Sequence, residues 1–392
     1  MPQTLLVTCT APGQDGVGAI ILDDLIRLFP ADRLTVAVVD TDPTTSSDVR
    51  HGIRVERFGR RYRLSGGARL GQIGRVVATP IVAHMQAAAT RSNAASVRAL
   101  LAKNRFERIW LVLSSPWIID LAAELTDEGV PLVALVWDDV EHNLSYFGAD
   151  AGTRRRLRAR FDQVLKQAHR VAVIGETMRE EYRSRYARDS VIVRHGLAPA
   201  SPPQRNESDG RVRIGFAGSV TARSAFDLLL STLDDMNWRV GDRDIELCVM
   251  GGRFDIWSRV PRRILCLGWR DVADTVAALA QCTFNYLPQP FESDWTNFAS
   301  LSFPSKTTTY LAAGAPILIH APAHASLPRF VADHPIAHTV GNLETASLRS
   351  AIESLSTDSE LRKRLSDAGR VALADVFSPT TFRRSFLEFL DA

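Results

Sequence analysis

The sequence predicts two α/β domains of the doubly wound kind, each built on a parallel sheet with helices on both faces. Short apolar runs alternate with helical patterns along almost the whole chain. Many of these runs are continuous and β-branched, which is typical of strands buried on both faces by crossover helices. The rhythm breaks once, at Ala198–Gly210, which holds three prolines and no periodicity. A strand and a glycine turn then start again, so the break predicts a linker between two domains.

These observations divide the 392 residues into four parts. Residues 1–198 form an N-terminal Rossmann-like domain, 199–210 a linker, and 211–378 a C-terminal Rossmann-like domain. Residues 379–392 form a final helix, with Ser378 as its cap and Pro379 at its first position. The domain against which this helix packs is left open.

The strand predictions follow the apolar runs. A helix is expected at Ile20–Phe29, and Arg50–Arg75 is expected to be largely loop because glycines interrupt it. The predicted strands are Thr4–Thr8, Leu34–Val39, Ile109–Leu113, Leu132–Val136, Val171–Ile174, Val191–Val193, Val212–Phe216, Ile245–Met250, Ile264–Leu267, Thr283–Leu287, Pro316–His320 and Ile336–Val340.

Composition and charge exclude several classes of protein. With 45% hydrophobic and 23% charged residues the chain is ordinary globular material. No apolar run approaches the ~20 residues of a membrane-spanning helix, and the first residues predict a strand, not a signal peptide. A net charge of +3 is too small to indicate nucleic acid binding. The four cysteines lie far apart, which indicates buried small side chains in a reducing, cytoplasmic compartment.

The first predicted strand leads into a glycine-rich turn before a helix. Gly13, Gly16 and Gly18 would let the backbone approach a ligand, and the helix N-terminus would favour an anion. Asp40 follows the second strand, 22 residues beyond Gly18, where a ribose-binding acid of a nicotinamide enzyme would lie. An NAD-dependent oxidoreductase therefore stays open as an alternative, as does a plain turn without a ligand.

An acidic cluster follows the predicted strand Leu132–Val136. Asp138 and His142 are placed at the carboxyl end of a parallel strand, where open α/β sheets bind ligands. Such side chains would position a hydroxyl nucleophile or take up its proton. Alternatively, Asp138 or Asp139 caps a helix.

The second domain repeats the pattern of strand, glycine turn and helix. Gly218 would open space, and Ser219 and Arg223 would donate hydrogen bonds to phosphate oxygens. The alternative is an exposed arginine in the first turn of a helix.

The most specific stretch is Tyr286–His320. It contains PQPFE, ending at Glu292, and later PSKTTTYLAAGAPIL. Pro304 and Ser305 start a helix and place Lys306 in its first turn, where the helix dipole disfavours a cation. A bound anion would explain that lysine; the alternative is a solvated side chain.

Two doubly wound halves with these motifs resemble retaining GT-B glycosyltransferases, in particular the large family four. The resemblance implies that the C-terminal half holds a nucleotide sugar, that the acceptor lies against the N-terminal half, and that a cleft closes between them. It places Glu292 beside the transferred sugar. The family's second glutamate, which binds the nucleotide ribose, falls at Thr309, and Ser293–Phe303 corresponds to an insertion.

The predicted function is therefore hexosyl transfer from a nucleoside diphosphate sugar to an acceptor hydroxyl, in polysaccharide or glycolipid assembly. The resemblance implies that the transfer is retaining. Lys306, Arg223 and the turn at Ser219–Ser224 would stabilise the leaving diphosphate without a metal or other cofactor. The loss of the second glutamate leaves a second alternative, a catalytically silent GT-B scaffold that acts as a binding partner.

One charged segment remains outside this site. Arg50–Arg75 holds eight arginines and one acid, Glu56. This concentration of positive charge predicts peripheral contact with an anionic membrane or a lipid-linked acceptor. The alternative is a solvated basic face whose arginines pair with carboxylates of the same chain.

Overall fold

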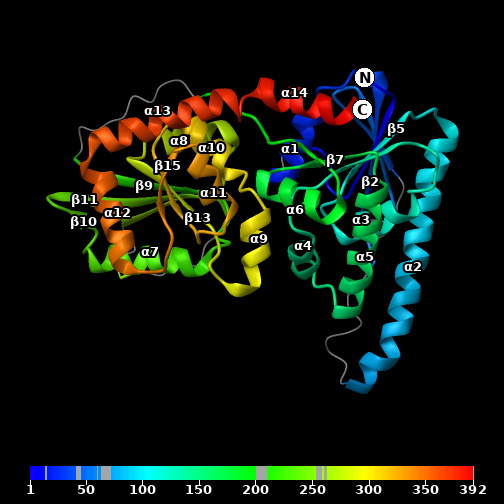
Figure 1. Cartoon of the computed structure of the whole chain (residues 1–392), viewed down its shortest axis with the longest axis horizontal. Coiled ribbons are helices and arrows are strands. Elements are labelled where there is room, and N and C mark those ends of the chain that lie inside the picture. The colour runs from blue at the N-terminus through cyan, green and yellow to red at the C-terminus, as the bar shows by residue number, and fades with distance from the viewer. Residues whose placement is uncertain are drawn as a thin grey trace. The chain divides into compact units, whose positions relative to one another are not determined.

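The computed structural model describes residues 1–392 except 14–15, 41–45, 60, 63–71, 200–209, 253–257, 260–262 and 392, and it describes 72–80 only as backbone. The chain divides into two units (Figure 1). The first comprises Met1–Val193 and Arg383–Ala392, and the second Arg194–Phe382. Both are α/β units with mainly parallel sheets, as predicted. The division falls five residues before the predicted boundary at 198, and most of the predicted linker lies outside the described residues.

The first unit is built on an eight-stranded sheet in the order β3-β4-β2-β1-β5-β6-β7-β8. Only β3 runs antiparallel to its neighbour. Strand order reverses at β1, because β2 lies on one side of it and β5 on the other. The strands are β1 (Thr4–Thr8), β2 (Leu34–Val39), β3 (Ser46–Arg50), β4 (Ile53–Phe58), β5 (Arg108–Val112), β6 (Leu132–Leu135), β7 (Arg170–Val173) and β8 (Val191–Ile192).

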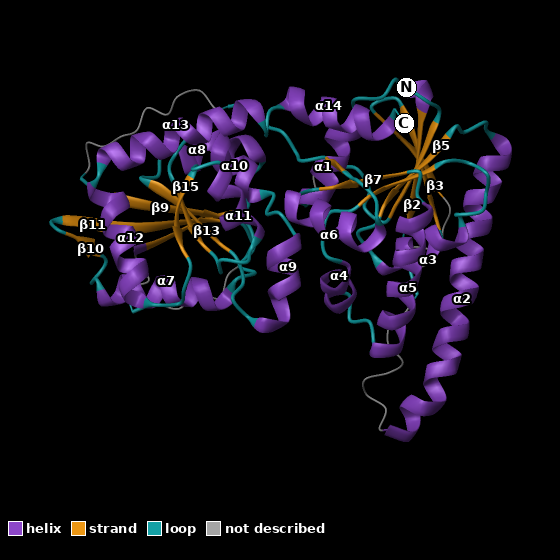
Figure 2. Ribbon diagram, in the orientation of Figure 1, coloured by secondary structure: helices purple, strands orange, loops and turns teal. Residues whose placement is uncertain are grey.

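Helices flank this sheet (Figure 2). The Phe29 and Phe386 rings pack against Trp110 at 6.1 and 4.9 Å between centroids, so the end of the last helix is part of this core. The helices are α1 (Val17–Ile26), η1 (Ala31–Arg33), α2 (Gln72–Lys103), α3 (Pro116–Glu124), α4 (Val140–Tyr146), α5 (Ala151–Gln167), α6 (Glu176–Tyr186) and α14 (Pro379–Leu390).

The expectation of loop across Arg50–Arg75 is wrong in part. β3 and β4 form a hairpin whose turn is His51-Gly52, both with positive φ, 53° and 79°. Two such residues fit the right-handed twist of the flanking strands. Every side chain of β3 is exposed or half-buried at this edge of the sheet, so no apolar run announces it. Helix α2 begins at Gln72.

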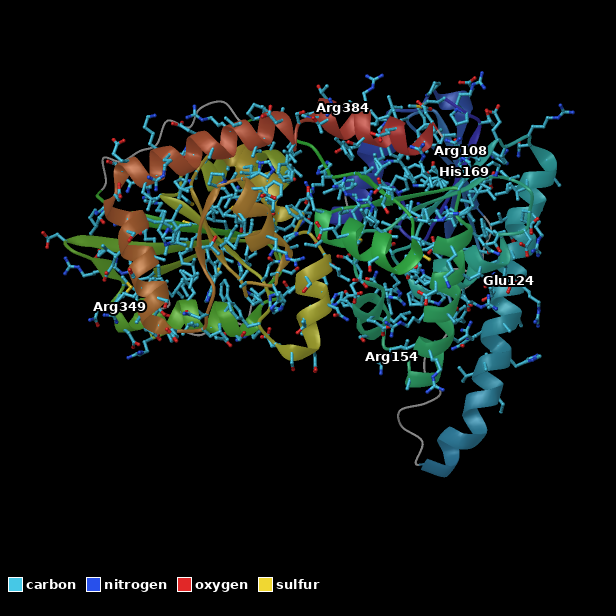
Figure 3. The ribbon with its side chains drawn as sticks, viewed as in Figure 1. Arg108, Glu124, Arg154, His169, Arg349 and Arg384 are labelled. Atoms are coloured by element: carbon cyan, nitrogen blue, oxygen red, sulfur yellow. The ribbon has the colours of Figure 1, made fainter. Side chains whose placement is uncertain are left out.

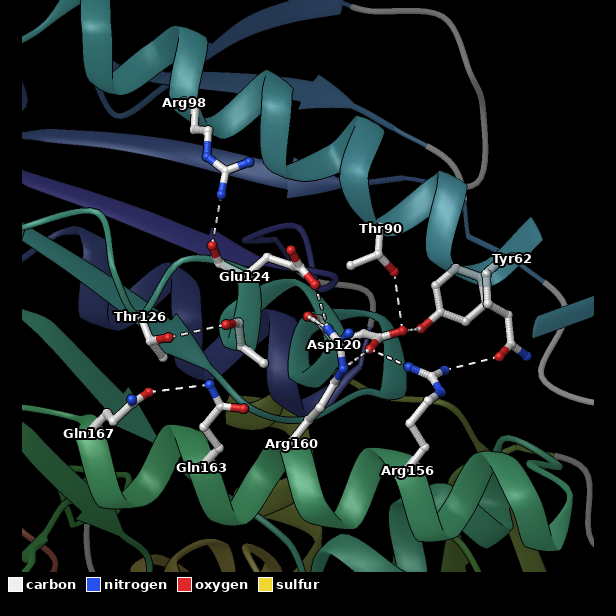
Figure 4. A network of polar contacts seen from close by, with 12 residues as sticks. Tyr62, Thr90, Arg98, Asp120, Glu124, Thr126, Arg156, Arg160, Gln163 and Gln167 are labelled. Atoms are coloured by element: carbon white, nitrogen blue, oxygen red, sulfur yellow. Dashed lines mark hydrogen bonds and ion pairs between the residues drawn. The ribbon is translucent and has the colours of Figure 1, made fainter. Parts of the chain in front are cut away.

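A buried carboxylate joins three helices of the first unit (Figure 4). Asp120 of α3 is fully buried. It accepts hydrogen bonds from Tyr62, Thr90 of α2 and Arg156 of α5, while Arg160 reaches it with Nε at 3.1 Å. Because all its partners are donors, the charge is compensated where it is buried. Burial and this carboxylate raise the pKa of Tyr62.

The second unit is built on a seven-stranded sheet in the order β10-β11-β9-β13-β14-β15, with β12 also paired to β11. Apart from the β10–β11 hairpin, the pairs are parallel. The strands are β9 (Val212–Ala217), β10 (Arg239–Val240), β11 (Arg243–Met250), β12 (Ile264–Gly268), β13 (Phe284–Pro288), β14 (Ile317–His320) and β15 (Ala337–Val340).

Helices also flank this sheet. Side chains of α7 and α12 form one apolar core with β9, β11 and β13. Figure 3 shows the side chains of both units and labels Arg349 on α12. The stretch predicted as an insertion, Ser293–Phe303, is mostly helical. The helices are α7 (Arg223–Asp235), α8 (Val272–Ala280), η4 (Ser293–Trp295), α9 (Thr296–Leu301), α10 (Lys306–Ala313), α11 (Ser326–Asp333), α12 (Thr345–Thr357) and α13 (Ser359–Asp375).

The final helix begins as predicted. The Ser378 hydroxyl accepts a hydrogen bond from the Thr381 backbone N–H at 3.1 Å, and Pro379 is the first helical residue. From Arg383 onward this helix belongs to the first unit.

Three cysteines are buried, but Cys266 on the edge strand β12 is exposed, against expectation. None of the described helices is both long enough and apolar enough to cross a bilayer.

Candidate functional site

The second unit brings two predicted site segments to one point of its sheet. β11 lies on one side of β9 and β13 on the other, so strand order reverses between β9 and β13. Open α/β sheets bind ligands at the carboxyl ends of the strands at such a switch point. The turn with Gly218 follows β9, and Glu292 follows β13.

Gly218 is required at the start of this turn for two reasons. Its φ of +94° is a conformation that side chains disfavour. A Cβ at this position would also lie 2.6 Å from Cε of Lys306. Glycine therefore lets the lysine cross directly over the backbone of the turn.

Lys306 lies over this turn from the first position of α10. Its Nζ donates to the Ser219 carbonyl oxygen at 2.7 Å and lies 4.6 Å from the centroid of the Phe216 ring. No carboxylate of the described residues forms an ion pair with it. Burial lowers the pKa of Lys306 to about 7. A half-buried amine beside a helix N-terminus, with no described carboxylate to compensate it, is suited to an anionic ligand.

Glu292 contacts the far end of the same turn. Its Oε1 accepts from the Ser224 backbone N–H at 3.1 Å, while Oε2 is buried with no hydrogen-bond partner among the described residues. Burial acts to raise the pKa of Glu292, but hydrogen bonds from its own backbone N–H and from Ser224 outweigh burial and lower it. A carboxylate acceptor and an amine donor thus bracket the turn.

Arg223 and Thr309, the other two residues predicted to bind the donor, have different surroundings from Lys306. The Arg223 guanidinium pairs with Asp227 on its own helix at 3.0 Å, and both side chains are more than half exposed. This is the alternative that the sequence left open, an exposed arginine in a first helical turn. Thr309 is half-buried on α10, between Thr308 and Tyr310.

Three side chains around this turn were not predicted as site residues: Tyr286, Tyr310 and His320. All three are fully buried. The Tyr310 hydroxyl accepts from the Ala217 backbone N–H, and the Tyr286 hydroxyl contacts Ala225. No local pattern marks them, because their hydroxyl and ring partners lie 22 to 93 positions away in the sequence.

In the first unit, the glycine turn and the acidic segment lie together. Gly16 is the N-cap of α1, with φ +96°. A Cβ on Gly18 would lie 3.0 Å from the Trp137 ring, so the turn packs against the residue that precedes Asp138. Asp40 is paired with Arg57 at 3.1 Å, so its carboxylate is engaged within the protein.

The two acids after β6 have different surroundings. Asp139 caps α4 by accepting from the His142 backbone N–H at 3.0 Å, and burial raises the pKa of Asp139. This matches the capping alternative. Asp138 and His142 are half-buried, burial lowers the pKa of His142, and its ring stacks on Tyr146 at 6.3 Å. These two side chains remain the candidates for acceptor chemistry.

The described arginines of the charged segment have partners in the chain. Arg50 pairs with Asp23, Arg54 with Glu56 and Arg57 with Asp40. Arg61 donates to the Cys9 and Val39 carbonyl oxygens. The other four arginines lie in the part for which side chains are not described. Over the described residues, no group of three or more His, Cys, Asp or Glu side chains is arranged to hold a metal ion.

A scan against protein-family models finds no match, and no curated protein matches the sequence. Solved structures do match. Sucrose-phosphate synthase from Thermosynechococcus elongatus has a TM-score of 0.68 at 13% identity, covering 99% of this chain and 98% of that one. HepE from Anabaena has 0.66 at 15%, covering 99% of both chains. α,α-Trehalose-phosphate synthase from Burkholderia xenovorans has 0.68 at 12%, covering 100% of both.

This chain shares their fold. The predicted fold class, two doubly wound Rossmann-like units of the GT-B type, is therefore confirmed along the whole chain. At such low identity the likeness extends to fold and not to function.

Proposed function

We propose that this protein is a glycosyltransferase that moves a sugar from a nucleoside diphosphate sugar to an acceptor hydroxyl. The observation that carries the proposal is Lys306, a half-buried amine with no ion-pair partner among the described carboxylates, held over the Gly218 turn at the switch point. A diphosphate is an anion of the kind that a helix N-terminus beside an amine would bind.

The proposed role of Lys306 follows from the chemistry of the leaving group. As the glycosidic bond breaks, negative charge grows on the diphosphate. A fixed ammonium and the backbone N–H groups at the start of α7 would stabilise that charge without moving. Glu292 accepts hydrogen bonds and would bind hydroxyl groups of the transferred sugar. Arg223 contributes less, because it is exposed and paired with Asp227.

The acceptor is assigned to the first unit. Asp138 and His142 lie after β6 of the first unit. Asp138 would orient the attacking hydroxyl or take up its proton. The retaining outcome is proposed from the resemblance to family four; the anomeric configuration of the product, read by proton NMR, decides it.

The matching structures suggest which donor to test first. HepE was solved with UDP and with UDP-glucose. The trehalose-phosphate synthase is described as UDP-forming and was solved with glucose-6-phosphate. We therefore take a UDP-hexose as the first donor and a sugar or lipid-linked sugar as the acceptor, in glycan assembly.

The experiment measures thermal shifts and calorimetric binding with UDP, GDP, ADP and their nucleotide sugars. NAD is included to test the oxidoreductase alternative. A nucleotide that binds the folded state raises its melting temperature. Binding of one diphosphate by the wild type, lost in Lys306→Met, supports the proposal. Protection by NAD alone favours the oxidoreductase, and no binding at all favours the silent scaffold.

Location and membrane contact form a further part of the proposal. Four free cysteines are expected in a reducing compartment, which supports a cytoplasmic location; cell fractionation tests it.

Anionic-membrane contact would depend on Arg60, Arg63, Arg69 and Arg75, because the other four arginines of the segment have partners. Vesicle co-sedimentation tests it: binding that rises with anionic lipid and falls with salt supports contact, and no binding at low salt rejects it.

A further inference from the structure

The pairing of β9 and β13 stops before either strand ends. Only Phe284 with Ile214 and Asn285 with Gly215 are paired, although β9 continues to Ala217 and β13 to Pro288. The two strands therefore part at the switch point. The Ala217 N–H is buried there, and a buried backbone donor requires another partner.

The Tyr310 hydroxyl supplies that partner. It accepts from the Ala217 N–H at 2.8 Å and lies 3.2 Å from the Tyr286 carbonyl oxygen, to which it donates. Ala217 belongs to β9 and Tyr286 to β13, so one side-chain hydroxyl replaces a missing bond of the sheet. Because Tyr310 projects from α10, it also ties the helix of Lys306 to both strands.

The Tyr286 hydroxyl holds the other end of the turn. It lies 2.9 Å from the Ala225 carbonyl oxygen, in the first turn of α7, and 2.7 Å from Nδ1 of His320. His320 Nε2 lies 2.7 Å from the Asn342 carbonyl oxygen, so Nε2 carries a proton. Burial lowers the pKa of His320, so in the neutral ring Nδ1 is an acceptor. The one proton of the Tyr286 hydroxyl is therefore shared between two acceptors, the Ala225 carbonyl oxygen and Nδ1 of His320.

We propose that Tyr310 and Tyr286 are positioning residues for the Ala217–Ala225 turn. One hydroxyl fixes the residue before Gly218, and the other fixes the residue after Ser224. With both ends fixed, the Ser219 carbonyl oxygen stays at Lys306 and the Ser224 N–H stays at Glu292. Removing the Tyr310 hydroxyl leaves the Ala217 N–H without its partner and frees the turn to shift. The consequence for ligand binding rests on the proposed function, whereas the order of the turn does not.

The test compares Tyr310→Phe and Tyr286→Phe with Ser356→Ala. The control removes a buried hydroxyl of the same unit, which donates to Ile352 within α12 and does not contact the turn. Two quantities are measured at a temperature well below unfolding: amide hydrogen exchange of the peptide spanning 217–225, and affinity for UDP, GDP and ADP. A melting curve accompanies each variant.

We expect exchange in this peptide to rise about tenfold in Tyr310→Phe and less in Tyr286→Phe, with no change in Ser356→Ala. Affinity for the diphosphate that the wild type binds should fall about three- to tenfold in both tyrosine variants. A lower melting temperature with unchanged exchange and affinity would show a merely structural role and overturn the proposal. If the wild type binds no nucleotide, the proposed function fails while the exchange data still decide the positioning role. If Tyr310→Phe does not fold, Tyr286→Phe decides alone.

Discussion

Each unit carries a glycine turn after the first strand of its sheet, and the two turns have different surroundings. After β9, Gly218 contacts the side chain of Lys306, a half-buried amine with no acid partner among the described residues. After β1, Gly18 lies under the Trp137 ring, and the nearby Asp40 is already paired with Arg57. The second unit therefore offers an amine with no described carboxylate partner, and the first offers an aromatic ring and the half-buried side chains of Asp138 and His142.

This difference teaches that a strand–glycine–helix pattern alone does not identify an anion site. Both turns present a helix N-terminus, so the dipole does not distinguish them. The distinguishing feature is whether the neighbouring charges are neutralised within the fold. Within Arg50–Arg75, three of the described arginines pair with carboxylates and a fourth donates to carbonyl oxygens. Lys306 donates to the Ser219 carbonyl oxygen and has no carboxylate partner among the described residues. We therefore assign the donor diphosphate to the second unit and the acceptor to the first.

The largest expected effect separates the two assignments. Asp138→Asn should lower turnover about 100-fold or more, the range for loss of a general base, while diphosphate affinity changes less than twofold. Initial rates with the identified donor, and calorimetry with the diphosphate, measure the two quantities. Equal loss of both would mean that Asp138 serves the donor and would break the comparison.

The second-largest effect compares how two basic side chains near the Gly218 turn, Lys306 and Arg223, contribute to diphosphate binding. Lys306→Met should weaken diphosphate binding by about 1.5–3 kcal/mol, because it removes a hydrogen bond to a charged group. Arg223→Met is the matched control, since that guanidinium is exposed and bonded to Asp227, and should cost less than about 0.5 kcal/mol. If Arg223→Met weakens binding as much as Lys306→Met, the assignment of Lys306 as the main cation is wrong.

A smaller effect concerns stability without ligand. The folded-state pKa of Lys306 is about 7, below the usual 10.5 of an unfolded lysine. Between these values the unfolded state binds more protons, so this residue makes the free energy of unfolding rise with pH, by at most about 1.4 kcal/mol per pH unit.

The measurement is urea unfolding of wild type and Lys306→Met from pH 7 to pH 10. Any stability advantage of the variant should shrink as pH rises, because methionine carries no proton to lose. A difference between the two proteins that stays constant over this range would contradict the lowered pKa.

Much of the fold could be predicted because buried strands and helix starts have local signals. Continuous apolar runs identified β1 and β2 to the residue, and Pro304-Ser305 placed Lys306 at the first position of α10. The hairpin of β3 and β4 was missed because β3 is a polar edge strand. Helix α9 was missed because it has six residues, too few for a periodic pattern.

The site was predicted in part for the same reason. Gly218, Glu292 and Lys306 lie in motifs with local signals, and the fold brings them to one turn. The Tyr310 hydroxyl reaches Ala217 across 93 positions, and Arg50 pairs with Asp23 across 27. Such partners are set by packing of elements distant in sequence, which neither periodicity nor spacing reports.

The most direct test of the central claim is proton uptake when the diphosphate binds. With a pKa of about 7, free Lys306 is mostly neutral at pH 8, and a bound anion would raise that pKa and recharge the amine. Calorimetry in buffers of different ionisation enthalpy should therefore show uptake of nearly one proton at pH 8, little at pH 6, and none in Lys306→Met. Diphosphate binding at pH 8 without proton uptake, or with the same uptake in Lys306→Met, would contradict the account.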